Sequence, residues 1–143
     1  MSEARFHAYA SLKAGERLQH WEYEPTALWK GEIEIRITHN GLCHTDIHMR
    51  DNDWGVSTYP LVPGHEVVGV VTKVGTDVTS LAVGDRVGFG WIRDACRQCD
   101  YCIQSEENIC RNDYTGFILG HHGGFSDKLR APADFAYKIP GSA

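Results

Sequence analysis

Residues 67–74 read Val-Val-Gly-Val-Val-Thr-Lys-Val, and this stretch decides the fold class. A short, nearly all-apolar run of β-branched residues predicts a strand that is buried on more than one side. Gly75-Thr76-Asp77 follows it with turn-forming residues. Upstream, residues 32–38 alternate polar and apolar side chains with a period of two, which predicts a strand with one buried face.

Shorter segments around these two runs extend the β pattern. Further strands are expected over residues 86–90 (behind the turn residues Gly84-Asp85), 125–131 and 135–139. Gly41 ends the first long strand, and residues 45–50 are expected to form a short helix. The sequence contains no long amphipathic helix and no internal repeat. We therefore predict a mainly β fold, an irregular β-barrel with short helices and metal-binding loops.

Length and charge limit the functions to consider. The chain has 143 residues and a net charge of −5 without a long basic run, which argues against nucleic acid and membrane partners. No apolar stretch approaches the roughly 20 residues that span a bilayer. The polar segment Met1–Arg5 lacks the apolar centre of a signal peptide. Together with five cysteines that point to metal rather than disulfides, these features predict a cytoplasmic protein.

Four of the cysteines have the spacing C-x2-C-x2-C-x7-C: Cys96, Cys99, Cys102 and Cys110. Short links of this kind bring four thiolates to one tetrahedral ion, as in a structural zinc site. A [4Fe–4S] cluster also uses C-x2-C-x2-C, but its bacterial pattern continues with x3-C-P, whereas here seven residues intervene and Arg111 follows. Disulfides, or unrelated thiols gathered by chance, would also account for four nearby cysteines. The spacing favours zinc.

A second set of metal-binding residue types lies upstream. Cys43 stands at a strand end, and His65 and Glu66 follow the proline-bounded segment 59–63. A cysteine, a histidine and a carboxylate form a ligand set suited to a catalytic zinc with an open position. Taken singly, Cys43 is also explained as a small buried side chain and His65 as a hydrogen-bonded turn residue.

A nucleotide-binding signature is missing from the sequence. No G-x-G-x-x-G follows a strand and opens a helix, so a dinucleotide-binding βαβ unit is not expected. Gly120-His121-His122-Gly123-Gly124 is rich in glycine but has neither the spacing nor a helix, and we expect a turn there.

Four motifs occur in one order along the chain: GLCHTDIH (41–48), YPLVPGHEVVGVVTKVG (59–75), VGDRVGFG (83–90) and the four-cysteine run. Together they resemble the zinc-dependent alcohol dehydrogenases of the medium-chain dehydrogenase/reductase superfamily, in particular the cinnamyl-alcohol-dehydrogenase-like branch. The resemblance extends from Ala8 to Pro140. It implies that residues 1–143 form the GroES-like β-barrel of the catalytic domain, with a structural zinc lobe around residues 91–113.

The resemblance also implies roles for the second metal set. Cys43 and His65 match catalytic zinc ligands, and Glu66 matches a glutamate that can enter the coordination shell. Asp46 matches the carboxylate that orients the histidine ligand; an N-cap of the short helix is its simpler explanation.

Four further residues match positions around the substrate. Thr45 matches the hydroxyl that takes the alcohol proton, and His48, one helical turn later, matches the exit of the proton relay. Trp54 and Trp91 match aromatic residues that line the substrate pocket. A solvated surface histidine and ordinary core aromatics are the corresponding simpler explanations.

The implied activity is interconversion of a small alcohol and an aldehyde. In the family, zinc acts as a Lewis acid on the alcohol oxygen and hydride passes to NAD or NADP. Relatives take a further zinc ligand and a nucleotide-binding domain from beyond the position of residue 143, so residues 1–143 are expected to be inactive alone. A homo-oligomer or a complementing nucleotide-binding domain is the expected partner.

The alternative is a stand-alone zinc-binding or partner-binding barrel without redox activity. A GroES-type chaperonin subunit is a third explanation, but it would leave both metal motifs unexplained.

Overall fold

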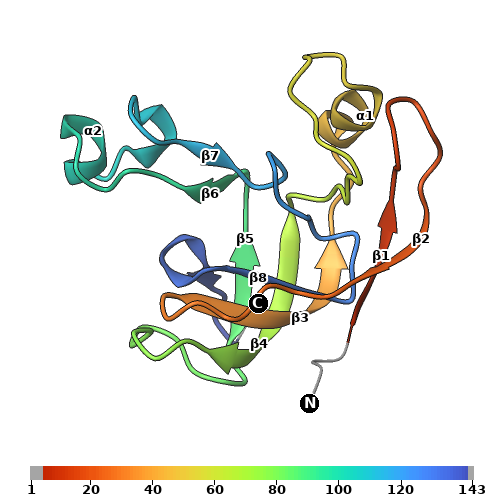
Figure 1. Cartoon of the computed structure of the whole chain (residues 1–143). Coiled ribbons are helices and arrows are strands. Elements are labelled where there is room, and N and C mark those ends of the chain that lie inside the picture. Colours follow the sequence, from red (N-terminus) through yellow and green to blue (C-terminus); the bar gives the residue numbers. More distant parts are fainter. Residues whose placement is uncertain (1–4, 142–143) are drawn as a thin grey trace.

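The computed structural model describes residues 5–141, which are built mainly from strands (Figure 1). The strands are β1 (Phe6–Ala10), β2 (Gln19–Tyr23), β3 (Glu32–Asn40), β4 (Val67–Val74), β5 (Arg86–Phe89), β6 (Ile92–Asp94), β7 (Thr115–Gly116), β8 (Lys128–Pro132) and β9 (Tyr137–Lys138). The helical elements are α1 (His44–Asp51), α2 (Asp100–Ile103) and the 3-10 turns η1 (Glu107–Ile109) and η2 (Ala133–Phe135).

The central sheet has five antiparallel strands in the order β8-β3-β4-β5-β9. Strand β4 has the bounds that the sequence predicts, and β3 continues two residues beyond the predicted end. The register between β3 and β4 shifts between Glu34 and Ile35 and again between Ile37 and His39. Because such irregularities bend a strand, they curve this sheet into the wall of the predicted barrel.

Valine and isoleucine side chains from β3, β4 and β5 fill the main core. Its largest fully buried members include Ile33, Ile35, Val67, Val71, Val87, Leu61, Met49, Phe117, Ile118 and Leu129. Strand β4 is less completely buried than the sequence predicts: Val67, Gly69 and Val71 are buried, Val68 and Val70 are partly exposed, and its last two residues are exposed. Its second face is therefore only partly covered.

The polar face of β3 also differs from the prediction. Glu34 was expected among the solvent-facing residues, yet only 3% of its surface is exposed. Its Oε2 accepts hydrogen bonds from Arg130 Nη2 (2.7 Å) and Nε (2.9 Å), and Lys73 Nζ lies 3.2 Å away. Burial would raise the pKa of Glu34, but these hydrogen bonds outweigh it and hold the pKa below its usual value.

The other predicted elements are present with shifted ends. The helix expected over 45–50 is α1. The strand expected over 125–131 is β8, which begins three residues later. The strand expected over 135–139 is only the two residues of β9, because η2 occupies the positions before it. Strands β1, β2, β6 and β7 were not predicted. Within residues 5–141, no helix has the length and apolar character needed to cross a membrane.

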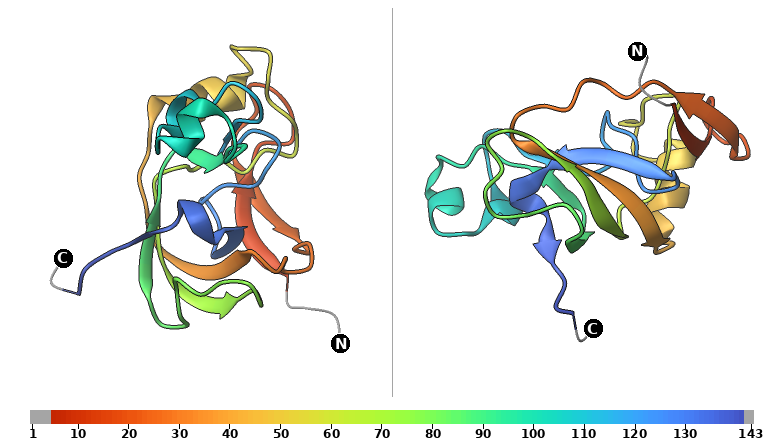
Figure 2. Two further views of the ribbon diagram at one scale, coloured as in Figure 1. Left: turned by 90° about the vertical axis from the view of Figure 1, so that its left-hand side faces the viewer. Right: turned by 90° about the horizontal axis from the view of Figure 1, so that it is seen from below.

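Strands β1 and β2 form a separate antiparallel ribbon. The ribbon joins the barrel through a bridge between Ala8 and Ser126 and a hydrogen bond from Tyr9 N–H to the Phe125 carbonyl (2.8 Å). On the other side of the barrel in Figure 1, β6, α2, η1 and β7 project as a lobe that carries the four-cysteine run. The right-hand view of Figure 2 shows the same projection from below, and the left-hand view looks onto the end of the lobe. Arg97 Nε anchors this lobe to Asp134 Oδ2 at 3.0 Å.

Candidate metal centres

Cys43 is the N-cap residue of helix α1 and directly precedes its first residue, His44. Asp46 is the third residue of the helix, and its Oδ2 accepts the backbone N–H of Cys43 at 3.1 Å. The explanation of Asp46 as the N-cap is therefore wrong: it caps the helix start from the first turn, in the manner of a capping box.

Residues 62–66 carry the other two candidate ligands on irregular backbone, because β4 begins only at Val67. Gly64 has a φ of +100°, and its N–H donates to Asp46 Oδ1 at 2.9 Å. A Cβ at this position would lie 2.9 Å from the Gly124 backbone nitrogen. The turn at Gly64 frees His65 and Glu66 from the strand alternation that would point them to opposite faces.

One ligand atom from each of Cys43, His65 and Glu66 lies within 4.8 Å of the others. His65 Nδ1 is 3.2 Å from Asp46 Oδ1, which leaves Nε2 available to an ion. The Asp46 hydrogen bond raises the pKa of His65 against the effect of burial. Burial would raise the pKa of Asp46, but hydrogen bonds from His65, Cys43 and Gly64 outweigh it and lower the pKa.

The chemistry of these donors fits a metal ion. The backbone N–H and then the hydroxyl of Thr45 hydrogen bond the Cys43 sulfur and lower its pKa, which favours the thiolate that binds metal. Sulfur, imidazole and carboxylate ligands match a zinc site that keeps a position for substrate.

Three of the predicted substrate-side residues lie on or after α1. Thr45 is half-buried beside Cys43. His48 Nδ1 lies 2.7 Å from Asp53 Oδ2, so it is paired rather than merely solvated, and its ring centroid is 4.9 Å from that of Trp54. Trp54 is 52% exposed, so it is not a core aromatic.

Trp91 lies next to the metal-binding residues. Its ring is edge-on to the His65 imidazole, with centroids 5.2 Å apart, and it packs against the main core. A large aromatic side chain therefore lies directly beside one candidate ligand.

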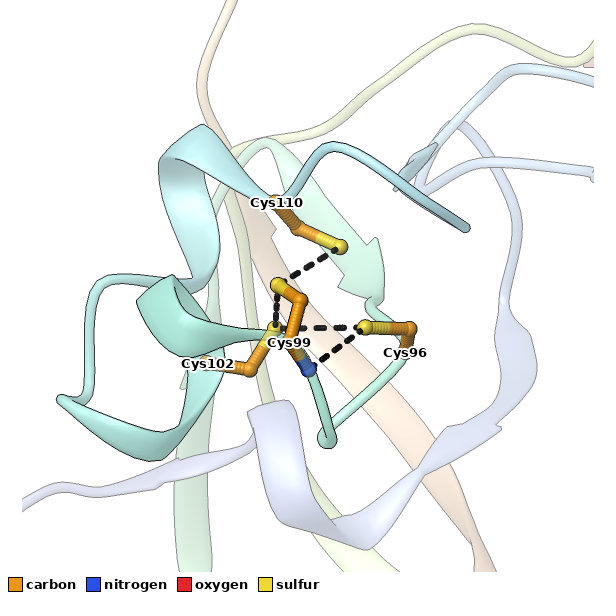
Figure 3. A group of neighbouring side chains, drawn as sticks. All are labelled: Cys96, Cys99, Cys102 and Cys110. Carbon is orange, nitrogen blue, oxygen red and sulfur yellow. Dashed lines mark hydrogen bonds between the residues drawn. The ribbon is translucent and has the colours of Figure 1, made fainter.

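The four-cysteine run folds around one point (Figure 3). Cys99 Sγ lies 3.6 Å from Cys102 Sγ and 4.0 Å from Cys110 Sγ, and Cys96 Sγ lies 3.8 Å from Cys102 Sγ. Ligands 2.3 Å from a tetrahedral zinc are about 3.8 Å apart, so the spacing fits. All four thiols are free in the structure, and the distances between their sulfurs are those of separate thiols rather than of disulfide bonds.

Electrostatics around the four sulfurs also suit a cation. Backbone N–H groups of Cys96, Asp113 and Asn112 lower the pKa of Cys110 to about 6. Burial first, and then the neighbouring thiols, raise the pKa of Cys102 to about 12. Four thiolates at these distances repel one another, and a divalent ion between them removes that cost.

The glycine-rich segment 120–124, where the sequence predicts a turn, is irregular with bends at residues 120, 121 and 124, and it contacts the segment that carries His65. Gly123 N–H donates to the Val62 carbonyl and Gly124 N–H donates to the Gly64 carbonyl, both at 2.8 Å. A Cβ at Gly123 would lie 2.4 Å from the Gly64 carbonyl oxygen. The loop thus holds the segment that carries His65 in place. In the sequence, the pair Gly123-Gly124 is the only sign of this close contact.

The family described as "Alcohol dehydrogenase GroES-like domain" matches residues 29–141. The chain belongs to this family. The chain is 46% identical over 133 residues to the aldehyde reductase AdhA of Synechocystis sp., an alignment that covers 93% of this chain and 39% of the relative.

Solved structures agree with the alcohol dehydrogenase fold. A cinnamyl alcohol dehydrogenase from Sorghum bicolor superposes with a TM-score of 0.87 at 38% identity, covering 97% of this chain and 42% of the other. A cinnamyl alcohol dehydrogenase from Helicobacter pylori complexed with NADP(H) gives 0.89 at 25% identity, covering 95% and 42%. The chain thus spans well under half of the length of these relatives.

Proposed function

We propose that this chain is the catalytic domain of a zinc-dependent alcohol dehydrogenase that interconverts small alcohols and aldehydes. The observation that carries the proposal is the convergence of Cys43, His65 and Glu66. Asp46 is hydrogen bonded to Nδ1 of the His65 imidazole, the ring nitrogen that would not bind the ion. In this proposal residues 91–113 are a bracing lobe, with a structural zinc ion on its four cysteines.

Cys43 and His65 are the proposed protein ligands of the catalytic metal, and Glu66 lies within reach of the same position. A bound zinc ion would supply a Lewis acid that lowers the pKa of an alcohol hydroxyl. Asp46 fixes the tautomer of His65 by accepting its Nδ1–H, and this also makes Nε2 a better electron donor.

Thr45 is the proposed first acceptor of the alcohol proton, because its hydroxyl lies beside the Cys43 sulfur. His48 is three residues further along α1, on the same face of the helix. Its Nδ1 lies 2.7 Å from Asp53 Oδ2, and this contact orients the ring. The proton would then leave from the His48 ring to solvent.

Trp91 and Trp54 are the proposed walls of the substrate pocket, on the His65 side and the His48 side respectively. Aromatic walls favour an apolar or aryl substituent on the alcohol. The hydride acceptor would be NAD or NADP, and the similar Helicobacter pylori protein is itself complexed with NADP(H). Nothing in the 143-residue sequence has the phosphate-binding pattern for it, so a complementing nucleotide-binding domain is part of the proposal.

The test is a chimaera that joins this chain to the remainder of the Synechocystis aldehyde reductase. Nicotinamide oxidation with an aryl aldehyde is measured for the chimaera, for Cys43→Ala and for Thr45→Val. Turnover that is lost in Cys43→Ala and strongly reduced in Thr45→Val supports the proposal. A chimaera that folds and retains zinc in the four-cysteine lobe, but turns over no faster than Cys43→Ala, favours the alternative of a zinc-binding or partner-binding barrel.

A further inference from the structure

The outer face of the β1–β2 ribbon gathers two histidines and a glutamate. In the register of the ribbon, His7 lies directly opposite Glu22, and His20 lies opposite Tyr9, diagonal to His7. Side chains alternate along each strand, so the neighbouring Ala8 turns to the other face and is buried. The three side chains therefore share one exposed face, while the opposite face packs on the barrel.

The distances suit a shared ion. His7 Nδ1 lies 3.2 Å from Glu22 Oε1, and one ligand atom from each of His7, His20 and Glu22 lies within 4.8 Å of the others. The two imidazole rings have centroids 5.9 Å apart and planes inclined by 31°. Nitrogen and oxygen ligands about 2.1 Å from one ion lie about 3.0–3.4 Å apart, so His7 and Glu22 already have the separation of two ligands.

The strand that carries His7 is held on both sides. The backbone N–H of His7 donates to Asp127 Oδ1 at 3.0 Å, and the His7 carbonyl accepts the Asp127 N–H at 2.8 Å. The other oxygen of Glu22, Oε2, lies 3.9 Å from Arg5 Nη1, which leaves Oε1 on the side of His7. The paired strands thus fix where the three residues lie on the ribbon, and their side chains bring one ligand atom from each within 4.8 Å of the others.

We propose that His7, His20 and Glu22 form a third metal site, for zinc or a related late first-row divalent ion. Two imidazoles and one carboxylate select such ions over calcium and magnesium, which prefer oxygen ligands. Water would fill the remaining positions, because all three residues are exposed. The site lies on the opposite side of the barrel from the four-cysteine lobe and contains no thiolate, so it binds more weakly and exchanges freely (Figure 1).

A plain ion pair between His7 and Glu22 is the competing explanation, and pH separates the two. An ion pair needs a protonated imidazole, so it strengthens as the pH falls. Metal binding needs neutral imidazoles, so it weakens as the pH falls.

The test uses the full chain with its cysteine sites loaded with zinc, and Ni²⁺ as the probe. Amide spectra of ¹⁵N-labelled protein are recorded during a Ni²⁺ titration at about pH 7.5. Paramagnetic broadening is expected first at residues 6–9 and 19–23. In His7→Gln and His20→Gln, the apparent affinity should fall by about ten-fold or more.

His39→Gln is the matched control, because His39 is also an exposed histidine on a strand but lies in β3 outside the cluster. It should leave the titration unchanged. Since the substituted side chains are exposed, the spectra of all three variants without Ni²⁺ should match the parent outside the substituted positions, which confirms that they fold. Broadening that persists at the ribbon in the His7→Gln/His20→Gln double variant, or affinity that does not fall between about pH 7.5 and 5.5, would overturn the proposal.

Discussion

Asp46 is a single buried carboxylate that joins three parts of the candidate catalytic site. It accepts the N–H groups of Cys43 and Gly64 and lies against His65 Nδ1. The start of α1, the turn before β4 and the imidazole therefore share one anchor. Asp46 is not a proposed ligand itself. A substitution at this position should nevertheless change the orientation of two proposed ligands, Cys43 and His65.

Asp46→Asn should weaken metal binding at Cys43 and His65 by about 10- to 100-fold, because the amide no longer holds the imidazole tautomer as a carboxylate does. The measurement is competition with a chelator that reports the dissociation constant of the ion at this site. Asp53→Asn is the control, since it removes a carboxylate that contacts His48 rather than a proposed ligand. Equal affinity in Asp46→Asn and the parent would contradict the orienting role.

Glu34→Gln should destabilise the fold by about 3–5 kcal/mol, because it removes the buried carboxylate that accepts two hydrogen bonds from the Arg130 guanidinium. The folded-state pKa of Glu34 is lowered, so its stabilising contribution is present above the unfolded value of about 4.3 and disappears as pH falls through the folded value. Urea denaturation at about pH 7 and in strong acid measures both effects.

The difference between the parent and Glu34→Gln should therefore narrow in strong acid. Glu24→Gln serves as the control: the side chain of Glu24 is 71% exposed, 4.0 Å from Arg5, and its loss should change the free energy of unfolding by less than about 1 kcal/mol. A Glu34→Gln variant as stable as Glu24→Gln would show that the buried pair contributes nothing net.

At the scale of elements, the lobe of β6, α2, η1 and β7 depends on its cysteines for internal contacts. Its small cluster contains Ala95, Cys102 and Phe135 as buried members, with the other three cysteines packed around them. Its strands β6 and β7 are only three and two residues long, so hydrogen bonds between strands contribute little to the stability of the lobe.

Cys102→Ser should therefore loosen the whole lobe, because one lost thiolate opens a closed coordination shell. Limited proteolysis followed by mass spectrometry should show faster cleavage within residues 96–113 while the barrel stays intact. Cys43→Ser is the control, since it lies outside the lobe and should leave that cleavage rate unchanged. Cleavage of Cys102→Ser at the parent rate would argue against a metal that braces the lobe.

At the scale of the whole molecule, the two cysteine-containing sites differ in how completely this chain encloses an ion. Four thiolates form a closed shell, whereas Cys43, His65 and the exposed Glu66 form a partial one. A chelator should therefore remove the ion at Cys43 well before the ion at the four cysteines, as followed by metal analysis over time. Loss of both ions at one rate would contradict this asymmetry.

The polypeptide of residues 1–143, assayed alone, should give no alcohol oxidation or aldehyde reduction above the Cys43→Ala background with either nicotinamide. Hydride transfer needs the nicotinamide held against the substrate carbon, and the sequence has no phosphate-binding glycine loop to hold it. The reaction would lose effective molarities that reach about 10⁵ M or more. Turnover well above the background would show that the barrel binds the cofactor by another route.

The sequence by itself determined what depends on local spacing. The bounds of β4, the position of α1 within one residue at each end, and the meeting of four cysteines all follow from patterns a few residues long. Such patterns set which backbone conformation is favourable before any distant contact forms. The likeness of four motifs to alcohol dehydrogenases supplied the family, which the comparisons confirmed.

Only the tertiary structure decided which polar residues are buried and which distant residues meet. Glu34 looks like a solvent-facing residue of an alternating strand until β8 brings Arg130, 96 positions later, against it. Two further features depend on pairings between separate segments. They are the contact of Gly123 with the segment that carries His65 and the cluster of His7, His20 and Glu22. Strand pairing and burial are properties of the assembled sheet, and neighbours in the sequence do not encode them.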